Sequence, residues 1–173
     1  VNGHYDSVEF LVDNGSEITK FDKDGLSALH LACLRSSDDI VPYLLSKTDK
    51  SIISKGDYKG RTPLHSAAHS ANIKLCKLLI SKGANVNETD FDGKNAILWC
   101  LTQPVSTLST NDIQYQSCLE YLVKQGVLLG VADRKKRNCL HYASYYSIES
   151  CVEYILAHSK SLLNQPDAKN QTP

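Results

Sequence analysis

Methionine is absent from the 173-residue sequence, and beyond tyrosine the aromatic residues are few, with one Trp and three Phe. Neither sign of charge dominates, because Lys plus Arg and Asp plus Glu both total 19. Bulk charge therefore gives no support for binding nucleic acid or an anionic membrane surface. No apolar run approaches the roughly 20 residues that a membrane-spanning helix requires, and no signal-peptide pattern opens the chain. From these absences we expect that the protein neither binds nucleic acid nor inserts directly into a membrane.

Both ends of the sequence interrupt a recurring unit. Residues 1–21 match only the second half of that unit, and Pro173 stops just before an expected apolar-His pair. Together with the missing initiator Met, this predicts that the sequence is part of a longer chain.

The cysteine count is even, which by itself would be compatible with disulfides. The cysteines are Cys33, Cys76, Cys100, Cys118, Cys139 and Cys151. However, each stands where another copy of the unit has a small or apolar residue, as Cys33 matches Ala68 and Cys151 matches Leu75. Such substitution is typical of buried thiols that act as small hydrophobes. We therefore expect a cytoplasmic protein, in the reducing cytosol or nucleus.

A short cassette recurs along the chain: Asp, then a turn residue that is usually Gly, a helix-capping residue at the sixth position, an apolar pair and a His. Copies begin at Asp22, Asp57, Asp90, Asp133 and Asp167, with spacings of 35, 33, 43 and 34 residues. A period in this range indicates a stacked solenoid rather than one globular core. We predict one array over 1–173, with units 22–56, 57–89, 90–132 (carrying an insertion near 103–111) and 133–166, and partial units at 1–21 and 167–173.

Each unit carries the signals of two helices. Ser27, Thr62, Asn95 and Asn138 can cap the orphaned amides of a first turn, so first helices should begin at residues 28, 63, 96 and 139. Second helices carry an apolar column formed by Leu11, Leu44, Leu79, Leu122 and Ile155. Gly15, Gly83 and Gly126 should end three of these helices in the left-handed conformation. Two short helices cannot cover their apolar faces alone, so the prediction is an all-α repeat solenoid.

The run from Gly60 to His65 (GRTPLH), continued by Leu78 to Asn87 (LLISKGANVN), closely resembles the ankyrin repeat. This resemblance implies helix-loop-helix units joined by projecting β-hairpin fingers, stacked into a curved array that binds partners on its concave face. Unit three departs from the pattern with Leu98 in place of His, and unit four has Lys136 in place of the turn Gly, which leaves its finger tip in question. Pro42 lies early in a second helix, which should start late or kink.

The side chains that could carry out catalysis or bind a metal are better explained by structural roles. We expect His30, His65 and His141 to bond to backbone or to their own cap and so tie adjacent fingers together. Cys139-x-His141 lacks the paired spacing of zinc motifs. No nucleophile elbow, phosphate loop or zinc-protease motif is present either. The sequence therefore predicts no enzyme activity, no metal and no cofactor.

Surface positions that carry aromatic or cationic side chains form the predicted partner site. The cationic run from Arg134 to Arg137 is either a solvated finger tip or a site for an acidic or phosphorylated segment. Tyr145 and Tyr146 either bind a partner or cover the adjacent unit. The candidate partner-binding residues are Arg35, Tyr58, Lys59, Arg61, His69, Phe91, Lys94, Arg134, Lys135, Arg137, Tyr145 and Tyr146.

Two functions follow from this pattern. The first is a non-catalytic protein-protein interaction module, a scaffold or adaptor that holds a protein or peptide through its fingers and its concave inner-helix face. The alternative is a regulatory or spacer segment of a larger multidomain enzyme, channel or transporter.

Overall fold

The computed structural model describes residues 3–102 and 112–173, so the predicted insertion near 103–111 lies outside the described residues. The α-helices are α1 (Gly3–Asp13), α2 (Ala28–Leu34), α3 (Ile40–Lys47), α4 (Pro63–His69), α5 (Ile73–Ser81), α6 (Ala96–Cys100), α7 (Asp112–Lys124), α8 (Cys139–Tyr145) and α9 (Glu149–His158). The 3₁₀ helices of the described ranges are η1 (Lys50–Ile53) and η3 (Lys160–Leu162).

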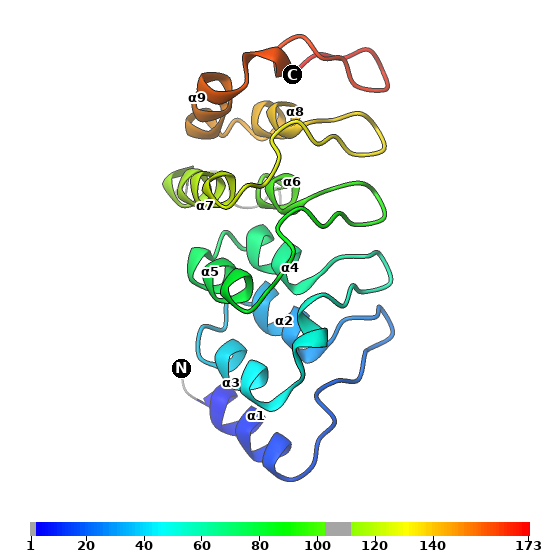
Figure 1. Cartoon of the computed structure of the whole chain (residues 1–173), viewed down its shortest axis with the longest axis vertical. Coiled ribbons are helices and arrows are strands. Elements are labelled where there is room, and N and C mark those ends of the chain that lie inside the picture. The colour runs from blue at the N-terminus through cyan, green and yellow to red at the C-terminus, as the bar shows by residue number, and fades with distance from the viewer. Residues whose placement is uncertain (1–2, 103–111) are drawn as a thin grey trace.

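The helices form two layers, with loops projecting from one side (Figure 1). The first helix of each unit (α2, α4, α6 and α8) stacks in one layer, and the second helices form the other layer, on the side away from the projecting loops. We call the projecting loops fingers; within the described residues they contain no β-strand, only the bridges Phe21–Ser27 and Ala132–Asn138. The chain is an all-α repeat solenoid, as predicted.

The predicted caps set the starts of the first helices. These helices begin at residues 28, 63, 96 and 139, as expected. Ser27, Asn95 and Asn138 each accept a hydrogen bond from an amide of the following turn. Thr62 belongs to a capping box with His65, and Pro63 follows it at a position where no amide donor is needed.

The core is built from contacts between units. Ala67, Ile97 and Leu98 are essentially inaccessible to solvent, and so are Leu79, Leu122 and Ile155 of the second-helix column. Burial of this apolar surface, at about 25 cal/mol per Å², is the main term that stabilises the stack.

Leu11 does not fit the predicted column. It is 55% exposed, and its neighbour Phe10 is 68% exposed. Helix α1 lies at the end of the stack (Figure 1), and its contacts to α3 come from other residues, such as Tyr5, whose ring meets that of Tyr43. The expectation of a buried Leu11 was therefore wrong, because no described element covers that side of α1.

All six cysteines lie in described residues, are buried and form no disulfide. Burial raises the pKa of the Cys33 and Cys139 thiols to about 12. Because thiolates are the reactive species, these two thiols are unreactive at neutral pH. The prediction of buried thiols that pack as small hydrophobes is confirmed.

Two second helices depart from the common length. Helix α3 begins at Ile40, two residues later in the repeat than α5, and Pro42 lies in its first turn. Helix α7 instead begins at Asp112, so part of the extra length of unit three is helical rather than lying between the helices. From this added turn, Gln114 donates to the carbonyl of Ala71, 3.3 Å away.

Every finger is held by the carboxylate of its first aspartate. In unit two, Asp57 Oδ1 accepts the amides of Lys59 (2.9 Å) and Arg61 (2.8 Å). The same pair of bonds recurs at Asp22, Asp90, Asp133 and Asp167. This arrangement persists with Lys136 in the turn, at φ 60°, so the doubt about the fourth finger tip was unfounded.

Adjacent fingers are also joined to each other by backbone bonds. The amide of Phe91 donates to the carbonyl of Lys59 (2.9 Å), and that of Arg134 to Asp92 (2.7 Å). Histidines add a second link. Nε2 of His30 bonds the carbonyl of Arg61 (2.8 Å), and Nε2 of His65 bonds that of Glu88 (3.0 Å). The structural reading of the histidines is confirmed.

These histidines make stability depend on pH. Burial lowers the pKa of His30, His65 and His69 below the ordinary 6.5, against the opposing effect of their carbonyl partners. The unfolded chain therefore binds more protons than the folded chain below pH 6.5. The stability that the neutral histidines contribute is complete above that pH, and it is lost as the pH falls toward their pKa values in the folded state. We expect the free energy of unfolding to fall between pH 6.5 and 5 by up to about 1.4 kcal/mol per pH unit for each histidine. Urea denaturation across this range measures the slope. Substituting His65 with Gln should reduce it, and an unchanged slope would contradict the assignment.

Finger stacking gives a second prediction. Gly60 has φ 76°, and a Cβ there would lie 2.7 Å from the ring of Phe91, whereas Gly83 has φ 103° and no atom within 4 Å of such a Cβ. Gly60→Ala should lower the free energy of unfolding by about 1 kcal/mol more than Gly83→Ala, because both share the backbone strain but only the former displaces the ring. Chemical denaturation of the two variants measures the difference. Equal losses would show that the Phe91 contact contributes nothing.

Candidate functional site

The surface of the first helices next to the fingers changes character along the array. We call it the inner face and define it by the residues nine to thirteen positions after each turn aspartate. At the ninth position stand Leu31, Ser66, Trp99 and Tyr142. The first two units therefore place small or aliphatic groups at the base of the fingers, and the next two place large aromatic rings there.

Cations alternate with these rings. Arg61 lies over the ring of Trp99 at 5.5 Å from its centroid, and Lys94 lies over the rings of Trp99 (4.9 Å) and Tyr142 (5.2 Å). Arg137 lies over Tyr142 at 4.8 Å. The three predicted cations Arg61, Lys94 and Arg137 thus form one row with two rings, which we call the cation-aromatic row. Each contact is worth about 0.5–2 kcal/mol depending on its exposure to water.

His69 closes one side of this row. Its ring meets that of Trp99 edge to face, with centroids 5.6 Å apart. Burial lowers its pKa, and the nearby charges of Arg61 and Lys94 act in the same direction. A neutral His69 is therefore the form compatible with the adjacent cations.

The second oxygen of each turn aspartate is used differently from unit to unit. In unit two, Asp57 Oδ2 accepts Nε of Arg61 at 2.6 Å. In unit four, Asp133 Oδ2 accepts both Nε (2.9 Å) and Nη2 (2.7 Å) of Arg137 and the hydroxyl of Tyr142 (2.9 Å). Burial raises the pKa of Asp57 and Asp133, but the hydrogen bonds from their arginines outweigh this effect, and both pKa values lie below 3.8.

Two of the predicted cations are therefore less available than the sequence indicated. Arg61 and Arg137 are committed to Asp57 and Asp133 by ion pairs. Arg134 and Lys135 are exposed, as is Lys59 on another finger. The predicted four-cation tip is corrected to three exposed cations, because Arg137 turns back into its own finger.

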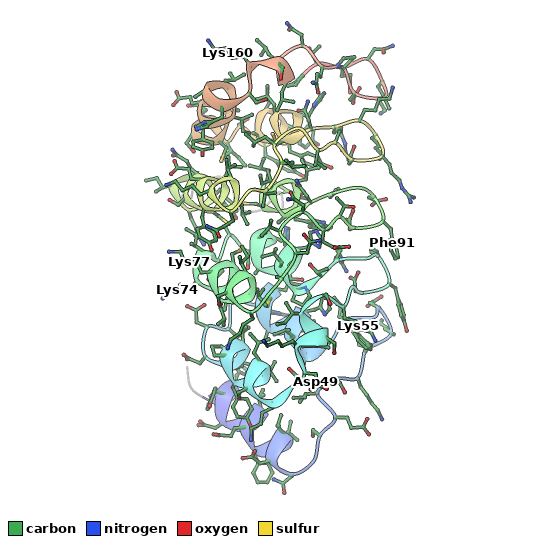
Figure 2. All side chains as sticks on the ribbon, viewed as in Figure 1. Asp49, Lys55, Lys74, Lys77, Phe91 and Lys160 are labelled. Atoms are coloured by element: carbon green, nitrogen blue, oxygen red, sulfur yellow. The ribbon has the colours of Figure 1, made fainter. Side chains whose placement is uncertain are left out.

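Tyr58 and Phe91 lie along the outer edge of the fingers and are 71% and 61% exposed. Figure 2 shows Phe91 at this edge, far from Lys74 and Lys77 on the opposite side of the molecule. Both rings also lie against the preceding finger, where a Cβ on Gly25 or Gly60 would meet them. Each therefore combines exposed apolar area with a structural contact.

Tyr145 and Tyr146 are in mutual edge-to-face contact, with centroids 4.9 Å apart, and Tyr145 is 80% exposed. With Tyr142 they border a surface depression of about 790 Å³ that also reaches Lys135 and Lys169. Arg35, by contrast, is exposed at the end of α2. Gln103, beside the inner-face residue Thr102, lies outside the described residues.

Sequence reasoning missed Trp99 and Tyr142, which organise the row. The available signal was their register, since both stand nine residues after a turn aspartate. The residue type at this position differs in every unit, so the repeat pattern alone does not mark it.

Neither a membrane span nor a metal site is found in 3–102 and 112–173. Within these ranges no helix has the length and apolar content needed to cross a bilayer. Nor do His, Cys, Asp and Glu side chains in the same ranges gather into a group of three or more that could hold a metal ion.

Comparisons with known proteins identify a family and several relatives. The family model described as ankyrin repeats (3 copies) matches residues 1–90. The chain is 27% identical over 161 residues to the transient receptor potential cation channel subfamily A member 1 homolog of Caenorhabditis elegans, covering 93% of the chain and 12% of that relative.

Two further relatives differ in how much of the chain they match. The chain is 24% identical over 181 residues to the transient receptor potential cation channel subfamily A member 1 of Drosophila melanogaster, covering 99% of the chain and 14% of the relative. It is 37% identical over 86 residues to the nuclear factor NF-kappa-B p100 subunit of Xenopus laevis, covering 48% and 9%. The chain thus spans only a small part of each of these relatives.

The aspartate of the fourth finger yields a prediction. Asp133→Asn removes the charge that receives Arg137 and Tyr142, while keeping the size of the side chain. We expect the free energy of unfolding to fall by about 2 kcal/mol, because the buried Tyr142 hydroxyl and the partly exposed Arg137 lose their charged acceptor. Asp92→Asn, an exposed change on a neighbouring finger, is the control and should change it by less than about 0.5 kcal/mol. Chemical denaturation compares the two, and equal effects would contradict the role given to Asp133.

Proposed function

Because the chain belongs to the ankyrin-repeat family, we propose that it is a non-catalytic protein-interaction module that binds a protein or peptide through its fingers and inner face. We propose one array over 1–173 with the unit boundaries predicted above, acting as a scaffold or adaptor in the cytosol or nucleus. The observation that carries this proposal is the cation-aromatic row over units three and four, which lies beside the exposed side chains of Arg134, Lys135 and Tyr145.

The rigidity of the stack suits this role. Adjacent fingers are fixed to one another by backbone bonds such as Phe91 to Lys59, and the inner face is fixed by stacked helices. A preorganised surface loses little conformational freedom when it binds. Binding energy is then available from the exposed groups themselves, of which Arg134, Lys135 and Tyr145 make the most accessible set.

An acidic or phosphorylated segment is the partner chemistry that we propose for the fourth finger. Arg134, Lys135 and Lys136 project from its tip, and the charge of Arg137 is already neutralised by Asp133. Charged partners of opposite sign are steered toward such a tip, mainly through the association rate.

A second function is supported by the length of the relatives. The two channel relatives match nearly the whole chain, which covers only 12% and 14% of them. We therefore keep the alternative that this array is a regulatory or spacer segment of a larger protein and contacts other parts of its own chain.

A site-specific capture experiment tests the main proposal. A photo-crosslinking amino acid at Tyr145 of the protein, expressed in its native cells, should capture a partner, whereas the same group at Ile113, 79% exposed on α7, should not. Arg134→Gln combined with Lys135→Gln should reduce capture at least about fivefold, because long-range attraction and tip contacts are lost together.

Matched controls make the outcome decisive. Lys74→Gln combined with Lys77→Gln removes the same charge from the opposite side of the molecule (Figure 2) and should leave capture unchanged. Crosslinks confined to the same polypeptide favour the regulatory alternative. Equal capture from Tyr145 and Ile113 would refute the inner face as the binding surface.

A further inference from the structure

In unit three, the cation that follows the turn aspartate makes different contacts from its equivalents in units two and four. Arg61, Lys94 and Arg137 occupy the same repeat position, four residues after the turn aspartate. In units two and four this residue turns back and pairs with its own aspartate. In unit three, Nε1 of Trp99 donates a hydrogen bond to Asp90 Oδ2 at 2.9 Å. The backbone amides of Asp92 and Lys94 donate to Oδ1 of the same carboxylate.

Lys94 lies over the aromatic rings instead of pairing with its aspartate. Its ammonium lies between Trp99 and Tyr142, and among the described residues no ion pair joins it to a carboxylate. The side chain of Lys94 is half-buried. Burial lowers the pKa of its ammonium, and the negative charges of Asp90 and Asp133 oppose this effect. The neighbouring Asp133 Oδ2 is fully used by Arg137 and Tyr142.

From this arrangement we infer that Lys94, held between Trp99 and Tyr142, is the subsite that receives an acidic side chain of an extended peptide partner. The inference rests on the proposed function and specifies its chemistry. A half-buried ammonium with cation-aromatic support and no ion-paired carboxylate gains more from an incoming carboxylate than a fully solvated lysine does. The two rings offer apolar contact to the methylene groups of an Asp or Glu side chain.

The position of the subsite favours a peptide as occupant. It lies at the base of two consecutive complete fingers, and its Tyr142 ring also borders the depression lined by Tyr145 and Tyr146. Arg61 and Arg137 flank Lys94 on either side, but each is paired with its own aspartate, so among the described residues of this row Lys94 is the cation that an incoming carboxylate can pair with. An extended acidic segment can seat one carboxylate at Lys94 and its neighbouring residues along the inner face.

The chain carries its own reporter for this site, because Trp99 is its single tryptophan. We expect blocked hexaglutamate peptide to change Trp99 fluorescence saturably, and blocked hexaglutamine to leave it unchanged. Lys94→Gln should weaken hexaglutamate binding by about tenfold, equivalent to about 1.4 kcal/mol. Free glutamate at equal carboxylate concentration should have no effect, since it lacks the extended chain.

The matched control is Lys77, which lies over the Tyr121 ring at 5.5 Å on the opposite side of the molecule (Figure 2). Lys77→Gln removes the same charge and the same kind of contact, and should bind hexaglutamate like the unmodified chain. If Lys94→Gln unfolds, Trp99→Phe provides a second test by calorimetry. It frees Asp90 to pair with Lys94, so binding should weaken although the lysine remains.

Three results would overturn the inference. The first is no saturable change of Trp99 fluorescence in the unmodified chain, and the second is unaltered hexaglutamate binding by folded Lys94→Gln. The third is hexaglutamate binding that Lys135→Gln abolishes while Lys94→Gln retains it. The last would place the acidic peptide on the finger tip. Failure here with Tyr145 capture intact refutes only the Lys94 subsite. If capture from Tyr145 also equals that from Ile113, the proposed function fails with it.

Discussion

The carboxylate of the turn aspartate is the group on which both the fingers and the inner face depend. One oxygen accepts two backbone amides in every finger, as Asp57 does from Lys59 and Arg61, and so fixes the loop without any strand. This leaves the second oxygen to be satisfied by whatever side chain the unit supplies. The same aspartate therefore sets the finger conformation and decides which cations remain available to a partner.

Stacking turns this local device into a continuous surface. The aromatic rings of Trp99 and Tyr142 come from two units, and Lys94 reaches both only because the fingers are held in register by bonds such as that from Arg134 to Asp92. A helix pair in isolation would expose its apolar column to water. The surface that we propose for binding is thus a property of neighbouring units rather than of any single one.

Much of the fold could be predicted because its signals are local. Caps such as Ser27 and Asn138 marked the first residues of their helices, and Gly83 marked a helix end with positive φ. Leu11 and the turn at Lys136 were misjudged for opposite reasons. Burial of Leu11 depends on what packs beside α1, whereas the Asp133 carboxylate secures a turn that lacks glycine.

The sequence by itself determined the repeat, the positions of the first helices and the burial of the cysteines, because these follow from capping chemistry and from the matching of residues between copies. Only the tertiary structure decided which charges pair. Arg61, Lys94 and Arg137 are equivalent in the repeat, yet Lys94 alone leaves its aspartate. In unit three Trp99, one helical turn inside α6, donates to Asp90 Oδ2 and Lys94 lies over the rings, whereas in unit four Arg137 shares Asp133 Oδ2 with Tyr142.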